Sequence, residues 1–268
     1  MYQYNNRLSV LALTLALSLP ATAQDQMTAD EIIAQVNARE DGAYLTREFT
    51  FELTNRNGKT RSQQATAYRR YFGDEKRTVI FYTEPARVRG TGFLTFDYAS
   101  PAATDDQWLY LPALRKVRRI SAADRGDYFL GTDFNYEEIK KEQKIEVTDY
   151  IFEYTGVKTI DGRNLFVVEG LPSNEDVADE LDLSKVVWRI DPDIWMSRQT
   201  EYYDKNGNHA RTISLKGVER ISGFITTTEL YAMNHKTGHS SRLRFTNTNY
   251  ENDIPDNFFT QARLRRGQ

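Results

Sequence analysis

The chain has 268 residues, with 35 lysines and arginines against 38 aspartates and glutamates and a formal net charge of −3. A charge so close to balance argues against a nucleic acid as partner, because phosphate backbones select strongly basic surfaces. The absence of cysteine excludes both disulfides and the acylated cysteine that anchors a lipoprotein. The length suits a single large β domain.

The first residues have the three-part layout of a secretory signal peptide. Arg7 supplies a positive charge, residues 8–19 form an apolar stretch, and Ala21-Thr22-Ala23 is a small-x-small cleavage site. The apolar stretch has about half the length that a membrane-spanning helix needs, which disfavours the alternative of an uncleaved anchor. We therefore expect residues 1–23 to be removed and residues 24–268 to form one periplasmic domain without a transmembrane segment.

A short helix is predicted next, over residues 28–38. Thr28 and Glu31 form a capping box, in which each side chain accepts a hydrogen bond from the other residue's backbone N–H. Ile32, Ile33 and Val36 then share one face, so the helix has an apolar side to bury.

Past Gly42 the apolar period changes from that of a helix to that of a strand. Between Ala43 and Thr54, apolar side chains alternate with threonine and glutamate, which predicts one buried and one solvated face. The residues expected on the buried face are Leu45, Phe49, Phe51 and Leu53. Strands over 59–72 and 77–83 follow too closely for crossover helices, so we expect an antiparallel meander.

The second half repeats this pattern. Turns rich in glycine and asparagine separate predicted strands over 147–159, 163–169, 185–191, 195–204, 210–218, 224–233 and 240–247. Residues 171–183 are acidic and have no period, so we expect a loop or short helix there. The expected fold is mainly β, a single large curved antiparallel sheet. One short helix cannot cover its apolar face, so the sheet either closes as a barrel or leaves a cavity for an apolar guest.

The strongest local feature spans residues 107–139. Trp108 to Leu111 is apolar on both faces, which is typical of a strand that water does not reach. A glycine-punctuated loop over residues 125–134 carries three large apolar side chains, Phe129, Leu130 and Phe134. These side chains either pack in the core or form a lid over the mouth of the cavity.

A basic cluster lies inside the same segment and contains Arg115, Lys116, Arg118, Arg119 and Arg125. One interpretation is a solvated strand whose charges pair with nearby carboxylates, where each exposed pair contributes little. The other is a patch at the cavity mouth that contacts lipid phosphates or an acidic partner, since guanidinium groups match phosphate geometry. The residues expected to make that contact are Arg115, Arg118, Arg119 and Arg125.

Signatures of catalysis are scarce. The chain has three histidines, and the i, i+4 pair of His235 and His239 falls in a predicted turn, which disfavours a metal site. The sequence contains no nucleophile elbow, phosphate-binding loop or dinucleotide fingerprint. We therefore expect no enzyme activity, no catalytic residues, no metal and no cofactor. Carboxylates distant in sequence leave a hydrolase open as an alternative.

The run WLYLPALRKVRRI…RGDYFLGTDFNYEEI resembles the LolA-like outer-membrane lipoprotein-sorting proteins, in particular the branch found beside RND-type exporters. The pattern N-x-x-Y-x-x-x-I-P-D-x-x-F-T over residues 247–260 is similar to that branch as well. The resemblance covers essentially the whole mature chain. It implies an incomplete antiparallel β-barrel with helical lids, whose hydrophobic concavity accepts acyl chains.

The expected function is therefore that of a carrier or chaperone for a lipid, a lipidated protein or another hydrophobic molecule. Two alternatives stay open: an accessory subunit of an RND-type exporter that acts by protein contact, and the hydrolase with dispersed carboxylates. The residues expected to line the cavity or its lid are Leu45, Phe49, Phe51, Trp108, Tyr110, Phe129, Leu130 and Phe134.

Overall fold

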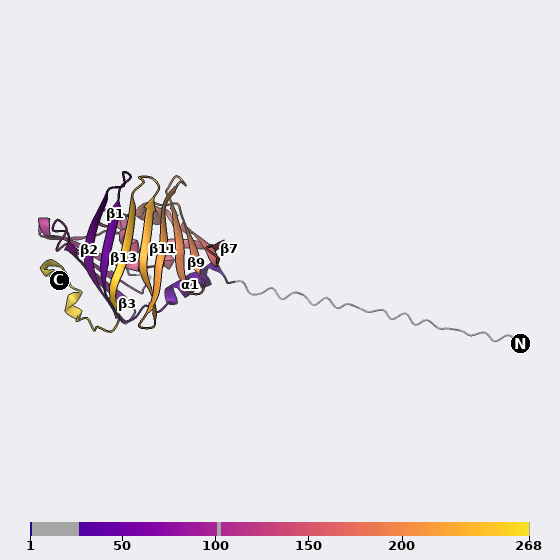
Figure 1. Ribbon diagram of the computed structural model, residues 1–268, viewed down its shortest axis with the longest axis horizontal. Coiled ribbons are helices and arrows are strands. Elements are labelled where there is room, and N and C mark those ends of the chain that lie inside the picture. The colour runs from indigo at the N-terminus through magenta and orange to yellow at the C-terminus, as the bar shows by residue number, and fades with distance from the viewer. Residues whose placement is uncertain (2–26, 101–102, 268) are drawn as a thin grey trace.

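The alternating segments of the chain form one antiparallel sheet in the computed structural model, which describes residue 1, residues 27–100 and residues 103–267 (Figure 1). In these ranges the sheet has 13 strands and is not closed into a barrel. The rest of the predicted signal peptide and its cleavage site lie outside the described residues. No helix in the described ranges is both long and apolar enough to cross a membrane.

Two meanders build the sheet. The first contains β1 (Tyr44–Thr54), β2 (Thr60–Phe72), β3 (Glu75–Glu84), β4 (Gly92–Asp97), β5 (Asp106–Leu111) and, after the 3-10 turn η1 (Pro112–Leu114), β6 (Lys116–Arg119). The second contains β7 (Tyr150–Ile160), β8 (Arg163–Pro172), β9 (Lys185–Asp191), β10 (Met196–Tyr203), β11 (His209–Ile221), β12 (Phe224–Asn234) and β13 (Ser240–Asn249). Because β1 pairs with β13, the spatial order runs from β6 through β1 and β13 to β7. The predicted antiparallel fold is confirmed.

The sequence prediction missed β4. Its residues Phe93 and Leu94 are fully buried, one in the apolar cluster on each side of the sheet. A strand buried on both faces lacks the alternation of apolar and polar residues on which the prediction depended. The acidic stretch over 171–183, by contrast, does contain a short helix, α3 (Glu175–Leu181).

The segment between the two edge strands, residues 120–149, is called the connector here. It contains the 3-10 turns η2 (Ala122–Asp124), η3 (Phe129–Gly131) and η4 (Val147–Asp149) and the helix α2 (Tyr136–Lys141). Because β6 and β7 form opposite edges of the sheet, the connector has to cross the sheet to link them. On the face that it crosses, called the inner face, Phe129, Phe134 and Ile139 join residues of β1, β3 and β4 in one apolar cluster.

The opposite, outer face of β3 to β5 is covered by the C-terminal segment (Figure 1), which contains η5 (Asp256–Phe258) and α4 (Gln261–Arg266). The apolar cluster there consists of Val79, Phe81, Leu94, Ile254, Phe259 and Leu264, with Trp108 and Tyr110 packed against it. Leu109 of the same strand belongs to the inner cluster. Both faces of β5 are therefore covered, which explains its continuous apolar run.

The helix α1 (Ala29–Ala38) begins as the sequence predicts. The Thr28 hydroxyl accepts a hydrogen bond from Glu31 N at 3.2 Å, and the Glu31 carboxylate accepts one from Thr28 N at 2.8 Å. The predicted apolar face is buried against Val168, Val186, Trp188 and Ile190 of β8 and β9. This helix thus closes the β8–β9 end of the molecule.

Phe51 tests the assignment of the inner face. Its side chain is fully buried, and its ring centroid lies 5.9 Å from that of Tyr82 and 6.3 Å from that of Phe129. Phe51→Asp places an unpaired charge among these rings and should lower the free energy of unfolding by about 3–5 kcal/mol. Thr50→Asp, on the other side of β1, should cost less than about 1 kcal/mol. Urea unfolding measures both, and equal losses would contradict the assigned facing.

Candidate functional site

A cavity lies where the inner face, the connector and the end of α1 meet. Its volume is about 110 Å³. A cavity needs roughly 10–15 Å³ to hold one water molecule, so this one has room for on the order of eight to ten groups of that size. One part of its wall is apolar and comes from the connector and four strands, with Phe49, Phe134, Ile139, Ile213, Leu230, Leu243 and Phe245.

The other part of the wall, called the charged end, consists of Arg39, Asp41, Arg47, Arg69, Glu142 and Lys144. Arg47 lies two residues from both Leu45 and Phe49 on β1 and therefore on the same face of the strand. The alternation that buries those two side chains buries the arginine too. Arg69 of β2 is opposite Leu45 in the strand register and is also buried. The sequence prediction overlooked both arginines, although the in-phase position of Arg47 was visible.

Ion pairs hold part of the charged end together. Arg69 Nη1 lies 2.9 Å from Asp41 Oδ2 and 3.5 Å from Glu142 Oε2. Arg47 Nη2 lies 3.0 Å from the same Glu142 oxygen. The Arg47 guanidinium also stacks on Phe245, 4.0 Å from its ring centroid. Glu142 belongs to the connector, so these contacts join the connector to β1 and β2.

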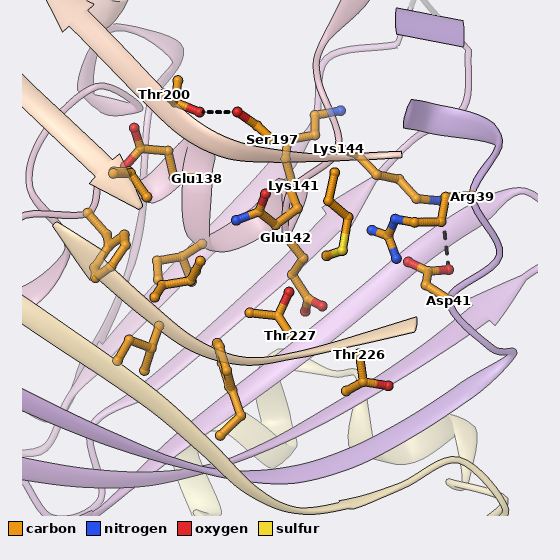
Figure 2. Close-up of a pocket in the computed structure, with 18 of the residues that line it drawn as sticks. Arg39, Asp41, Glu138, Lys141, Glu142, Lys144, Ser197, Thr200, Thr226 and Thr227 are labelled. Carbon is orange, nitrogen blue, oxygen red and sulfur yellow. Dashed lines mark hydrogen bonds and ion pairs between the residues drawn. The ribbon is translucent and has the colours of Figure 1, made fainter. Parts of the chain in front are cut away.

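Arg39 and Lys144 are less well neutralised. Figure 2 shows both near Asp41 at one end of the pocket, with Glu138 at the other. Lys144 Nζ lies 3.7 Å from Asp41 Oδ1, and Arg39 donates a 3.5 Å hydrogen bond to the carbonyl oxygen of Ile225. Burial lowers the pKa of the Arg39 guanidinium and of the Lys144 ammonium more than Asp41 raises them. Their surroundings therefore disfavour their positive charge.

Further buried ion pairs fasten the connector to the sheet. Glu138 of α2 accepts two hydrogen bonds of 2.6 Å from Arg211 of β11. Lys141 Nζ lies 2.7 Å from Asp97 Oδ1 of β4 and 2.5 Å from Glu146 Oε2. Removing one partner of such a pair leaves a buried charge uncompensated, which is costly. These contacts therefore keep the connector against the inner face.

Three carboxylates beside α2 lie close enough together to share a cation, those of Asp97, Asp105 and Glu146. Lysines occupy this place: Lys141 Nζ lies 3.9 Å from Asp105 as well, and Lys76 Nζ lies 2.9 Å from Asp97. Lys140 forms an ion pair with Asp105. The carboxylates are thus the counter-charges of the lysines.

Two of the three histidines share a partner, and the third has a different one. His209 and His235 flank one hydroxyl, with each Nε2 2.9 Å from Thr212 Oγ1. His239 Nδ1 lies 2.5 Å from Asp133 Oδ2 in the connector. The i, i+4 pair of His235 and His239 therefore does not share one ligand position, in line with the turn predicted there.

A family model described only as that of an uncharacterized protein matches residues 74–266, well over half of the chain. The chain belongs to this family. No curated protein matches it.

Solved structures connect this family to the LolA-like fold. A DUF1329 family protein from Desulfovibrio piger is 24% identical with a TM-score of 0.79, over 87% of this chain and 96% of that one. A Vibrio parahaemolyticus domain named for outer membrane lipoprotein sorting is 25% identical with a TM-score of 0.79, over 88% and 97%. A LolA superfamily protein from Nitrosomonas europaea is 19% identical with a TM-score of 0.67, over 89% and 100%. The fold implied by the sequence motifs is confirmed.

In this LolA-like chain, three of the eight residues predicted for the cavity or its lid line the cavity: Leu45, Phe49 and Phe134. Phe51 and Phe129 are buried in the inner cluster, and Leu130 packs against it. Trp108 and Tyr110 pack on the outer face instead. They alternate with Leu109 and Leu111, and successive residues of a strand point to opposite sides.

The four arginines predicted to contact a head group or partner do not line this cavity. Arg115 is exposed, while Arg118 and Arg119 pair with Asp124 and Asp106 at 2.7 and 2.5 Å. Arg125 is mostly buried and donates two 2.8 Å hydrogen bonds to Asp149 and one of 2.9 Å to Glu180 of α3. Arg125 therefore ties the connector to α3.

Gly126 in the predicted lid is required by close packing. A Cβ at this position would fall 2.3 Å from the carbonyl oxygen of Glu180 in α3. Gly131 has a φ of +79°, a conformation that glycine adopts without strain. Both glycines thus fit the position that the connector has in this structure.

Asp97 gives the fastening contacts a pH dependence. Burial by itself would raise the pKa of its carboxyl, but the ammonium groups of Lys76, Lys141 and Lys140 together outweigh burial and hold the pKa well below its usual value. Such a carboxyl stabilises the fold above its unfolded pKa of about 4 and loses that contribution as the pH falls further. We expect Asp97→Asn to lower stability at neutral pH by about 3–5 kcal/mol, because two buried lysines lose a partner.

The same variant should also have a shallower loss of stability below about pH 4 than the wild type. The control is Asp253→Asn, whose carboxyl is 75% exposed beside Arg70 and should change neither quantity. Thermal unfolding across the acid range measures all three proteins. If the stability of Asp97→Asn fell with decreasing pH as steeply as that of the wild type, Asp97 would not be the group responsible.

Proposed function

We propose that the protein is a periplasmic carrier that holds a lipid, a lipoprotein acyl chain or another hydrophobic molecule between the inner face and the connector. The observation that carries this proposal is the cavity, whose apolar wall is shared between the connector and strands β1, β11, β12 and β13. A site with a wall on two separate elements can be opened by moving one of them. The predicted signal peptide supports the periplasmic location.

The energy of burial suits this function. Each methylene removed from water contributes about 0.8 kcal/mol, so eight to ten groups contribute on the order of 6–8 kcal/mol before the costs of association. A long acyl chain needs more room than the cavity of about 110 Å³ offers. Loading a full chain therefore requires the connector to shift away from the inner face.

The connector is suited to such a shift. Its longest helix, α2, has six residues, and much of its length consists of 3-10 turns and irregular backbone. It is held by packing of Phe129 and Phe134 and by discrete ion pairs. Segments with few regular backbone hydrogen bonds open at a lower free energy than strands within a sheet.

The similarity to the Vibrio parahaemolyticus domain supports a hydrophobic cargo, because that domain is named for lipoprotein sorting and shares the fold over nearly its whole length. We extend that role to this chain as a proposal. It also accounts for the scarcity of catalytic signatures in the sequence, which makes the hydrolase the weakest of the alternatives.

An RND-type exporter as partner stays a prediction from the sequence motifs. Edge strand β7 offers a surface for a protein contact, because its Ile151 and Val157 are 63% and 54% exposed. Large exposed apolar side chains on an edge strand are typical of interaction surfaces. A contact with an exporter is therefore our second candidate function, and it is compatible with cargo binding.

Leu230 provides the test of the cavity. Leu230→Trp adds an indole to the apolar wall and should lower the affinity for a neutral probe such as N-phenylnaphthylamine by about tenfold, the equivalent of roughly two methylenes. The matched control is Tyr231→Trp, the next residue of β12, which contacts Arg242 and does not line the cavity. Fluorescence titration measures both. If the two variants bound the probe equally, the ligand would not lie in this cavity.

A disulfide lock tests the movement of the connector. Asp133 N donates a 2.9 Å hydrogen bond to Ser241 Oγ of β13, which in turn donates one of 2.6 Å to Asp133 Oδ2. The double change Asp133→Cys and Ser241→Cys places two thiols at this contact in a chain that has no cysteine of its own. Oxidation should slow uptake of the probe, and reduction should restore it.

The two single cysteine variants serve as controls, because each disturbs this contact without forming the bridge: Ser241→Cys removes the hydroxyl from both hydrogen bonds, and Asp133→Cys removes the carboxylate acceptor. Stopped-flow fluorescence gives the rate of uptake, and titration of free thiols confirms that the bridge has formed. Uptake at the same rate in the oxidised and reduced double variant would mean that loading does not require the connector to move.

A further inference from the structure

The charged end of the cavity holds more positive than negative charge. The cations are Arg39, Arg47, Arg69 and Lys144, and they face the two carboxylates of Asp41 and Glu142. The other charged residues of the wall are neutralised elsewhere: Lys141 by Asp97 and Glu146, and Glu138 by Arg211. Arg47 and Arg69 are buried and Arg39 and Lys144 are half-buried. Positive charge removed from water without matching negative charge is unfavourable, so this end of the cavity favours an additional anion.

Unpaired donors accompany this excess of charge. The Nε–H groups of Arg39, Arg47 and Arg69 are buried and have no acceptor among the described residues. The Arg47 side chain is only 7% exposed, so bulk water does not supply the acceptor that its Nε–H lacks. A buried donor without an acceptor is itself unfavourable. An anion with several oxygens would offset the charge of these arginines, and it would supply the missing acceptor to an Nε–H group whose guanidinium turns toward it.

The same cavity continues into an apolar wall. Phe49 and Phe245 flank the Arg47 guanidinium, which lies 4.9 and 4.0 Å from their ring centroids. Phe134, Ile139 and Leu243 extend this wall. An occupant of the whole cavity thus needs one anionic group and an apolar chain.

We propose that the charged end binds the anionic oxygen group, a carboxylate or a phosphate, of a single-chain amphiphile whose tail lies along the apolar wall. This inference rests on the proposed carrier function and names the class of its cargo. The amphiphile has one chain because the cavity, about 110 Å³, holds only part of one long chain before the connector moves and has no room for a second.

Glu142 makes loading competitive. Its carboxylate occupies part of the anion site, 3.0 Å from Arg47 and 3.5 Å from Arg69. An incoming carboxylate or phosphate offers these arginines the same interaction. Because Glu142 belongs to the connector, its displacement removes a contact that holds the connector to β1 and β2, and binding of the head group is coupled to opening.

The test compares dodecanoate, dodecyl phosphate and dodecanol by isothermal titration calorimetry with the full-length mature protein. We expect both anions to bind about tenfold or more tightly than dodecanol, the effect of one or two charge-assisted hydrogen bonds. Arg39→Gln should remove most of this preference and leave the dodecanol affinity within about twofold. Glu142→Gln should bind both anions more tightly than the wild type, because the internal competitor is gone.

The matched control is Arg220→Gln, since Arg220 is an exposed arginine that bonds to the carbonyl oxygen of Gly223 and should not affect any of the three ligands. If Arg39→Gln does not fold, as judged by circular dichroism, Lys144→Gln takes its place. Equal binding of dodecanol and the two anions by the wild type would overturn the anion site and leave the carrier function standing. No binding of any of the three would overturn the carrier function itself. The tighter of the two anions identifies the head group.

Discussion

The placement of β6 and β7 at opposite edges of one sheet determines much of the rest of this structure. The chain leaves the sheet at one edge and re-enters it at the other, so residues 120–149 have to cross the strands between. An open antiparallel sheet also needs cover for its apolar inner face. The same segment meets both needs, and the cavity lies where that cover is incomplete, next to β1 and β13.

The segment that covers the apolar inner face is rich in charged residues, so its charges need partners in the sheet. The connector brings Glu138, Lys141 and Glu142 into the protein interior, where an isolated charge is strongly unfavourable. The sheet supplies counter-charges from inward positions, among them Arg211, Asp97 and Arg47. This matching positions the connector by specific contacts as well as by packing. At the charged end the matching is incomplete, and there a ligand can supply what the chain lacks.

Several elements follow from local sequence. The capping box of Thr28 and Glu31 and the alternation along β1 depend on neighbouring residues, and both are found as predicted. The strand β4 was missed because its two faces are covered by segments far away in the chain, which erases the alternation. Trp108 was assigned to the wrong face for the same reason. A run of apolar residues shows that both sides of a strand are buried, but not which side faces the connector and which the C-terminal segment.

The sequence by itself determined the antiparallel meanders, the N-terminal helix and the LolA-like fold, because turns, caps and periods act over a few residues and the family motifs are continuous. The tertiary structure alone decided which side chains form the site. Arg39, Arg47, Arg69 and Glu142 come from a loop, two strands and the connector, up to about a hundred residues apart. These residues come together only because the connector crosses the inner face. Whether they are neutralised depends on the charges of all of them added together. Neither property is present in any one stretch of the chain.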